Sequence, residues 1–280
     1  MNEIKIYAFA DEASPNIDEQ ITALKRNELN GLEIRNVDGA NVSDITLEKA
    51  KEVKTKLDAN GLITWSIGSP IGKIDIENDD FKAHLEKLKH TLEIANILNS
   101  KNIRMFSFYI PDGKDAKLYK SEVIDRLGQM CKIAKEYDVL LCHENEKGIY
   151  GDIPERCLEI YKAIPELKGI FDPANFVQSN SDTLEAWDML KDYIYYMHIK
   201  DAKIDGTVVP AGMGDGNVEK VVKNFIQKGG NSFTIEPHLT VFEGFSHLER
   251  KGEKSQISEY VYPDSNTAFD AACNALKGLL

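Results

Sequence analysis

The sequence predicts the α/β class and, within it, a single eight-stranded (β/α)8 barrel. Eight short apolar runs alternate with longer amphipathic segments along the 280-residue chain. The runs are continuously apolar, as expected for parallel strands that are covered on both faces. An alternating series of this kind indicates a closed barrel, and a doubly wound open sheet is the second choice. No change in composition and no Gly/Ser-rich linker divides the chain, so we expect residues 1–280 to form one domain.

The predicted strands are rich in β-branched and aromatic residues. They are Ile4–Phe9, Gly31–Ile34, Ile63–Ile67, Ile103–Phe106, Val139–Cys142, Gly169–Phe171, Tyr195–Ile199 and Phe233–Ile235. Helical spacing of apolar residues is clearest in the segments between the first five strands. These segments are Ile17–Glu28, Leu47–Ala59, Phe81–Leu98 and Val123–Tyr137.

Helix ends are also marked in the sequence. Asn60-Gly61 and Gly229-Gly230 predict left-handed residues after the second and seventh helices. Asp152 followed by Pro154 predicts a helix start that is capped by the aspartate.

A long segment at about 237–266 interrupts the alternation of strands and helices. It is polar and charged, and it includes Glu249-Arg250-Lys251. Loops of this length inside a compact domain are usually functional or mobile. We interpret the segment as a lid or a subunit contact, and the sequence favours neither. Its two histidines, His238 and His247, are expected at the surface.

Charge and the lengths of the apolar runs argue against two classes of partner, nucleic acid and membranes. A formal charge of -12 and a pI of about 5.1 argue against nucleic acid, whose phosphates such a chain repels. No CxxC pair occurs, so we expect reduced thiols. The sequence has neither a signal-peptide pattern nor an apolar run of about 18 residues. These features predict a cytoplasmic protein with no membrane partner.

Four consecutive predicted strands end in an ionisable residue. The residues are Glu144, Asp172, His198 and Glu236. Taken singly, Glu144 or Asp172 is equally well a helix cap or a solvated loop residue, and His198 is better explained as a core histidine. Catalytic groups in such barrels lie at the carboxyl ends of the strands, so recurrence at four ends predicts one shared mouth. Three carboxylates and an imidazole suit one Mn²⁺, Co²⁺, Mg²⁺ or Zn²⁺ ion, which also relieves their mutual repulsion.

The motifs around these residues resemble the sugar phosphate isomerase/epimerase group of xylose isomerase-like TIM barrels. The matching motifs are Glu33-Ile34-Arg35, Glu144-Asn145, Phe171-Asp172-Pro173-Ala174-Asn175, His198-Ile199-Lys200-Asp201, Gly212-Met213-Gly214-Asp215-Gly216 and Ile235-Glu236. The resemblance covers nearly the whole chain and is weak for substrate. It implies that the four residues named above coordinate one divalent metal ion.

Two departures from the family pattern bear on activity. Many relatives carry a histidine three residues after the metal-binding aspartate, where this chain has Asn175. An amide can hydrogen-bond a substrate hydroxyl but cannot transfer protons near neutral pH. The endonuclease IV-like relatives bind three zinc ions and need further histidines on the middle strands. Here those strands end in Trp65-Ser66-Ile67-Gly68 and Met105-Phe106-Ser107-Phe108, so we expect no DNA substrate.

The resemblance implies isomerase or epimerase chemistry through an enediolate. A metal ion chelated by the substrate's carbonyl and hydroxyl oxygens stabilises the developing oxyanion. We predict that Glu144 and Glu236 are the catalytic base and acid, and that Asp172 and His198 mainly hold the ion. The expected partner is a small sugar, a polyol ketone or a sugar phosphate, and the sequence leaves a homo-oligomer open.

Five residues are predicted to bind the substrate. They are Asn175, Lys200, Glu33, Arg35 and Glu146. Lys200 is expected to bind a phosphate or carboxylate, with a solvated lysine as the alternative. Glu33 and Arg35 form either a polar pair in the mouth or an ion pair between strands. Glu146 lies on the same side of its strand as Glu144.

Two further features of the sequence can have a structural role instead of a functional one. His143 should face opposite to Glu144, toward the helices, and pack there. The glycines at 212, 214 and 216 bring backbone N–H groups toward a ligand or form a simple turn.

Two other functions remain open from the sequence. A hydrolase, dehydratase or lyase would use the same metal ion with bound water. A non-catalytic sugar-binding barrel would keep the fold, and loss of a metal ligand would favour it.

Overall fold

The computed structural model describes residues 3–241 and 262–280, and its eight parallel strands close a barrel. The order around the barrel is β1-β12-β9-β8-β7-β6-β5-β2, which confirms the barrel and excludes the open sheet. The strands are β1 Lys5–Ala8, β2 Gly31–Ile34, β5 Ile63–Gly68, β6 Asn102–Met105, β7 Leu140–Glu144, β8 Lys168–Phe171, β9 Ile194–Ile199 and β12 Ser232–Ile235. Closure comes from β1 and β12, where Lys5 pairs with Ser232 and Ala8 with Ile235.

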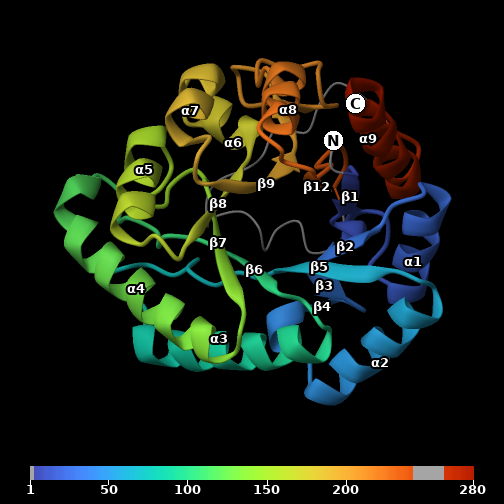
Figure 1. Cartoon of the computed structure of the whole chain (residues 1–280), viewed down its shortest axis with the longest axis horizontal. Coiled ribbons are helices and arrows are strands. Elements are labelled where there is room, and N and C mark those ends of the chain that lie inside the picture. The colour runs from blue at the N-terminus through green and yellow to red at the C-terminus, as the bar shows by residue number, and fades with distance from the viewer. Residues whose placement is uncertain (1–2, 242–261) are drawn as a thin grey trace.

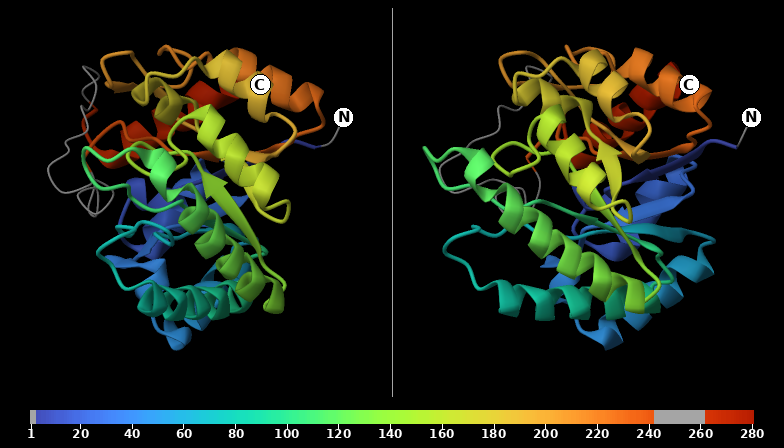
Figure 2. Two further views of the ribbon diagram at one scale, coloured as in Figure 1. Left: turned by 90° about the vertical axis from the view of Figure 1, so that its left-hand side faces the viewer. Right: turned by 60° about the vertical axis from the view of Figure 1, so that its left-hand side comes forward.

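The helices pack around the outside of the strands, as Figures 1 and 2 show. They are α1 Ile17–Arg26, α2 Leu47–Ala59, α3 Phe81–Ile97, α4 Lys120–Glu136, α5 Pro154–Ala163, α6 Pro173–Gln178, α7 Thr183–Leu190, α8 Val218–Gln227 and α9 Ser265–Leu279. Their apolar faces and the strands form one large core. Burial of this surface is the main force that holds the barrel together.

Short helices and two-stranded ribbons lie in the loops that follow the strands. The 3-10 helices are η1 Ala10–Glu12, η2 Val42–Asp44 and η3 Ala116–Tyr119. Two small antiparallel ribbons are formed by β3 Asn36–Val37 with β4 Ala40–Asn41, and by β10 Asp201–Ala202 with β11 Val208–Val209.

Most predicted element bounds agree with the structure. The strand Gly31–Ile34 and the helix Leu47–Ala59 have the predicted bounds. The larger differences are at α4, which begins at Lys120 rather than Val123, at α1, which ends at Arg26 rather than Glu28, and at β7, which extends to Glu144. The latter extension arises because Glu144 itself pairs with Ile170 of β8.

The predicted helix ends are partly confirmed. Gly61 and Gly229 adopt φ values of +68° and +91°, the left-handed conformation that favours glycine. The predicted Asp152 cap is wrong, because Ile153 is the N-cap of α5 and provides no side-chain hydrogen bond. Instead, the Asp152 carboxylate pairs with Arg156, one turn into the helix.

The two tryptophans lie in different parts of the fold. Trp65 of β5 stacks on Tyr7, with ring centroids 4.9 Å apart, and on Tyr195 at the start of β9. Trp187 of α7 packs edge-on against Phe171, the last residue of β8, at a centroid distance of 5.6 Å. Each indole therefore belongs to a separate aromatic cluster of the core.

The structure tests the predictions on the cysteines, membrane spans and the long loop only in part. All four cysteines are free thiols, as expected. Within the described residues, no helix is both long and apolar enough to cross a membrane. In the predicted long loop, residues 242–261 and hence His247 lie outside the described residues, so its role as a lid or a subunit contact stays a prediction. The loop was predicted slightly too long, because α9 already begins at Ser265.

Candidate metal centre

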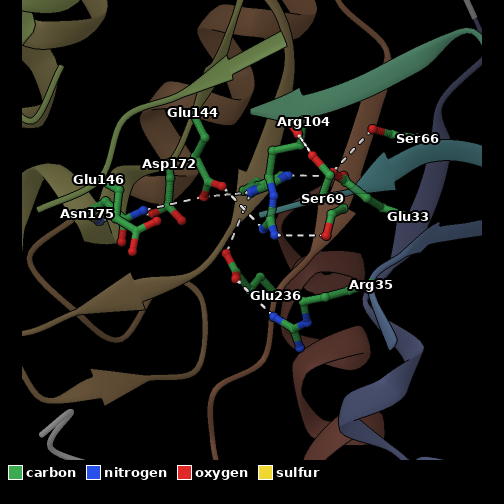
Figure 3. Close-up of polar contacts among 12 residues, drawn as sticks. Glu33, Arg35, Ser66, Ser69, Arg104, Glu144, Glu146, Asp172, Asn175 and Glu236 are labelled. Atoms are coloured by element: carbon green, nitrogen blue, oxygen red, sulfur yellow. Dashed lines mark hydrogen bonds and ion pairs between the residues drawn. The ribbon is translucent and has the colours of Figure 1, made fainter. Parts of the chain in front are cut away.

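The carboxyl ends of four adjacent strands bring four ligand-type side chains together. Glu144 ends β7, Asp172 follows β8, His198 lies in β9 and Glu236 follows β12. One ligand atom from each lies within 4.8 Å of all the others, and all four residues are buried. Figure 3 shows the Glu144 and Asp172 carboxylates next to each other, with Glu236 directed toward the same region. The structure thus places these residues where one ion could contact them all.

His198 lies between two glutamates. Its Nδ1 is 2.9 Å from Glu144 Oε1, and its Nε2 is 3.0 Å from Glu33 Oε2. Burial lowers the pKa of His198, but the charges of Glu144 and Glu33 outweigh burial and hold the pKa well above its usual value. A metal ion at Nδ1 would replace the proton that faces Glu144.

The three carboxylates experience different electrostatic surroundings. Burial raises the pKa of Asp172 to about 7, although the Lys200 ammonium opposes the shift. Burial also works to raise the pKa of Glu144, but the charge of His198 prevails and lowers it. For Glu236, the charge of Lys200 overcomes burial and holds the pKa well below the usual value. The centre therefore depends on nearby positive charge to keep its carboxylates ionised.

Two carboxylate oxygens have a geometry that fits a bound cation. Glu144 Oε2 and Asp172 Oδ2 are buried and accept no hydrogen bond from the residues that the structure describes. Their only close cations in that part are Arg104, 3.3 Å from Glu144 Oε2, and Lys200, 3.0 Å from Asp172 Oδ2. The two oxygens therefore depend on ion pairs with these buried cations, and a divalent cation would be a further partner for them. The donor set and these two atoms fit a divalent metal ion.

Lys200 is buried against the centre. Its Nζ lies 3.0 Å from Asp172 Oδ2 and 3.1 Å from Glu236 Oε2, and only 6% of the side chain is exposed. The solvated alternative for this lysine is therefore wrong. Asn175, in the first turn of α6, is also at the centre, with Nδ2 3.4 Å from Glu144 Oε1 and 2.8 Å from the carbonyl oxygen of Asn145.

Glu33 and Arg35 lie in different places. Glu33 is fully buried inside the barrel, where Tyr196 donates a hydrogen bond of 3.0 Å to it and His198 contacts it. Tyr196 is two residues earlier in β9 than His198, so Glu33 lies deeper in the barrel than the four proposed ligands. It is thus beneath His198 rather than in the open mouth.

Arg35 joins a cluster of acidic residues on the other side of the centre. Its guanidinium contacts Asp11 at 2.9 Å, Glu12 at 3.0 Å and Glu236 at 3.4 Å. These ion pairs are buried, and Figure 3 shows Arg35 next to Glu236. A guanidinium at this distance from Glu236 holds that carboxylate in place.

The surface placement predicted for His238 is wrong. Its Nε2 lies 3.4 Å from both Glu12 Oε1 and Glu236 Oε1, and 12% of the side chain is exposed. Its backbone N–H also donates a 2.6 Å hydrogen bond to Glu12. His238 has a φ of +44°, so the chain turns back toward the mouth directly after β12. Burial raises the pKa of Glu12 to about 8.

Several residues of the centre were missed by the sequence reasoning. Asp11 and Glu12 follow the first strand. The search for ionisable residues at the carboxyl ends of the strands, which found the four ligands, could therefore have found them too. Arg104 interrupts an apolar strand, which is a detectable signal for a charge inside the barrel. Its guanidinium lies between Phe9 and Phe106, with its carbon 4.9 and 5.0 Å from the two ring centroids.

Glu146 has a partner that no sequence pattern indicated. Lys73, in the loop after β5, lies 2.7 Å from Glu146 Oε1 and 4.4 Å from the centroid of the Phe106 ring. Glu146 is thus at the rim, as expected from its spacing to Glu144, but it is ion-paired. His143 faces the helices as predicted, because its Nδ1 contacts the Tyr161 hydroxyl of α5.

The glycine-rich loop holds a carboxylate of the chain itself. Backbone N–H groups of Gly212, Gly214 and Gly216 donate to the Asp201 carboxylate at 2.9, 2.9 and 3.0 Å. A Cβ atom at Gly214 would lie 2.4 Å from Asp201 Oδ1. The predicted approach of backbone N–H groups thus occurs, but their acceptor is Asp201 rather than a ligand.

Solved structures with the same fold cover almost the whole chain. The probable 3-DHS dehydratase AsbF of Bacillus anthracis is 15% identical with a TM-score of 0.74, and 99% of each chain is covered. D-Psicose 3-epimerase of Clostridium cellulolyticum H10, solved with D-tagatose, is 15% identical with a TM-score of 0.73 and 98% of each chain covered. IOLI protein, solved with a zinc atom, is 16% identical with a TM-score of 0.72, covering 99% of this chain and 97% of the other.

Sequence comparison supports the same grouping. An uncharacterized protein of Methanocaldococcus jannaschii, MJ0008, is 24% identical over 127 residues. That match covers 45% of this chain and 56% of the relative. The family model described as "Xylose isomerase-like TIM barrel" matches residues 21–251. Because that model spans most of the barrel, the chain belongs to the xylose isomerase-like TIM barrel family.

Proposed function

We propose that this chain is a divalent-metal-dependent isomerase or epimerase. Its substrate would be a small sugar, a polyol ketone or a sugar phosphate, converted through an enediolate. The observation that carries the proposal is the convergence of Glu144, Asp172, His198 and Glu236 within 4.8 Å. The likeness to a D-psicose 3-epimerase solved with D-tagatose supports the choice of reaction.

The four convergent residues would hold one Mn²⁺, Co²⁺, Mg²⁺ or Zn²⁺ ion. When bound, the ion would stabilise negative charge on the oxygens of the substrate. The zinc atom in the structure of IOLI protein supports a metal in this kind of barrel. Asp172 and His198 would serve mainly to fix the ion.

Glu144 and Glu236 would transfer the proton. Glu144 in its ionised form removes the proton from the carbon next to the carbonyl and later releases it to water, and Glu236 takes up a proton from water and returns it on the other side. Arg104, 3.3 Å from Glu144 Oε2, helps to hold the base ionised. Lys200, 3.1 Å from Glu236 Oε2, favours the ionised form of Glu236, so Glu236 acts as the acid only after it has taken up a proton. An ionised carboxylate is required of the base that starts the reaction.

The residues around the pair would bind the substrate. Asn175, Arg35, Lys200 and Glu146 can donate to or accept from hydroxyl groups or an anionic group of the sugar. Glu33 takes a different role in this proposal than its sequence position suggested. Its contact with His198 Nε2 supports orientation of the imidazole rather than contact with the substrate.

The Glu144→Gln variant tests the proposal. Proton exchange from D₂O into a panel of ketoses, aldoses and polyol ketones is followed by NMR, with added Mn²⁺. We expect exchange and isomer formation in the wild type and a loss of about 1000-fold in the variant. Glu86→Gln, on an exposed face of α3, is the matched control. Equal exchange in Glu144→Gln and wild type would remove Glu144 from the mechanism.

A dehydratase is the second candidate. It is supported by the likeness to the probable 3-DHS dehydratase AsbF over 99% of both chains. Mass spectrometry of the products separates the two reactions, because an epimerase or isomerase conserves substrate mass and a dehydratase releases one water. Loss of water without isomer formation would favour the second candidate.

A further inference from the structure

Lys200 contacts the oxygens of two proposed metal ligands. Its ammonium lies 3.0 Å from Asp172 Oδ2 and 3.1 Å from Glu236 Oε2. Asp172 Oδ2 accepts no hydrogen bond from the described residues, so this ammonium is its main source of positive charge there. An ammonium and a divalent ion that approach the same oxygens repel each other.

The position of this lysine is fixed by the next residue. The Asp201 carboxylate accepts backbone N–H groups from Gly212, Gly214 and Gly216, and a fourth, at 2.9 Å, from Ala202. Asp201 is fully buried. A carboxylate held by four N–H groups cannot shift without losing several of them, so the backbone beside Lys200 is rigid.

The surroundings leave Lys200 no other place for its charge. The side chain is 6% exposed, and leaving its carboxylate partners would strand a buried ammonium, which is costly. The lysine therefore stays near any ion in this centre. Repulsion at this range is weakly screened by salt, because the groups are buried.

We infer that Lys200 sets the affinity of this centre for divalent metal ions, holding it well below the affinity that the four ligands alone would give. Asp201 is the positioning residue that keeps the lysine in place. The inference rests on the metal centre of the proposed function but not on the reaction. In consequence, Asp172 and Glu236 share their charge with the lysine and donate less of it to the ion.

Metal affinity measured by calorimetry tests this inference. Mn²⁺ is titrated at pH 8 in two buffers of different ionisation enthalpy, so that any proton released from Asp172 on binding is measured, because loss of the lysine charge raises the pKa of this buried carboxylate further. We expect Lys200→Met to bind Mn²⁺ at least about tenfold more tightly than the wild type, since a cation next to the ion is removed. The matched control is Lys73→Met. Lys73 lies in the same mouth but pairs with Glu146, so its removal should leave the Mn²⁺ affinity within about twofold of the wild type.

A second variant covers the case in which the methionine protein does not fold. Lys200→Gln keeps a hydrogen-bond donor beside Asp172 and Glu236 but carries no charge, and its fold is checked by circular dichroism. Unchanged or weaker Mn²⁺ affinity in the folded variant would overturn the inference. The two proposals fail separately: absence of proton exchange in a metal-binding wild type counts against the function alone.

Discussion

His198 has two ring nitrogens with different surroundings, and this difference matters at the scale of single residues. Nδ1 faces Glu144, whereas Nε2 faces Glu33 at 3.0 Å. Metal-binding histidines commonly donate the other ring N–H to a carboxylate, which fixes the orientation of the ring and increases its basicity. Glu33 is in the right place to accept that N–H.

Glu33→Gln should therefore weaken metal binding. The amide replaces a charged acceptor by a neutral one, and we expect a loss of 10- to 100-fold, about the range for such partners. Mn²⁺ titration gives the affinity. Ser66→Ala, which removes a 3.3 Å hydrogen bond to Glu33 and a 3.1 Å hydrogen bond with the Tyr196 hydroxyl but leaves the Glu33 side chain in place, is the control and should change the affinity little. Wild-type affinity in Glu33→Gln would show that the imidazole needs no such partner.

His84 should make stability depend on pH. Its Nε2 accepts a 2.7 Å hydrogen bond from the Gly72 N–H, and burial lowers its pKa from 6.5 to about 4. Between these pH values the unfolded chain binds more protons than the folded one. The free energy of unfolding should thus fall as the pH drops from about 6.5 to about 4, by up to about 3 kcal/mol.

Urea unfolding at pH 7 and pH 4.5 measures this change in the free energy of unfolding. His84→Gln keeps an acceptor for Gly72 but does not titrate, so its stability should fall less between the two pH values. His90→Gln on the same helix is the control. Equal losses in wild type and His84→Gln would contradict the prediction.

At the scale of elements, the glycine loop around Asp201 is tightly packed. A methyl group on Gly214 would approach Asp201 Oδ1 to 2.4 Å and the Ala202 carbonyl oxygen to 2.6 Å. Gly128 in α4 is the opposite case, because an added Cβ meets nothing within 4 Å. The two positions allow the same substitution to be compared in crowded and open surroundings.

Gly214→Ala should destabilise the protein, and Gly128→Ala should stabilise it. We expect a loss of about 2–3 kcal/mol at Gly214 from overpacking. At Gly128 we expect a gain of about 0.5–1 kcal/mol, because alanine is the better helix former. Urea unfolding measures both changes. A neutral Gly214→Ala would show that the loop can move away from Asp201.

Element positions could be predicted well from the sequence because they depend on local patterns. The apolar run Gly31–Ile34 is a strand, and the four ionisable residues meet because strand ends share one face of the barrel. The Lys73–Glu146 pair could not be predicted, since it depends on how the loop after β5 folds. The fold of the turn after β12, which brings His238 to Glu236, was likewise not encoded in any spacing.

At the scale of the whole molecule, an ion would join four neighbouring strands. The proposed ligands lie on or directly after β7, β8, β9 and β12, which are adjacent in the barrel. A ligand that binds only the folded state stabilises it by mass action. With Mn²⁺ at about 100 times its dissociation constant, we expect Tm to rise by about 5 °C.

Thermal unfolding with EDTA and with Mn²⁺ tests this effect. The control variant Glu86→Gln should keep the full shift, and Asp172→Asn should lose most of it. An equal shift in Asp172→Asn would place the ion elsewhere on the molecule.

The contact between Trp187 and Phe171 gives the chain an optical reporter of its own. Phe171 directly precedes Asp172, so rearrangement of that carboxylate reaches the indole through one ring. Trp65, stacked between Tyr7 and Tyr195, also reaches the centre through one ring. It packs edge-on against Tyr196 at a centroid distance of 5.8 Å, and the Tyr196 ring lies 5.6 Å from the His198 ring. Emission should therefore change on adding Mn²⁺ in both Trp65→Phe and Trp187→Phe, each variant reporting through the indole that remains, so that ion binding can be followed without any dye.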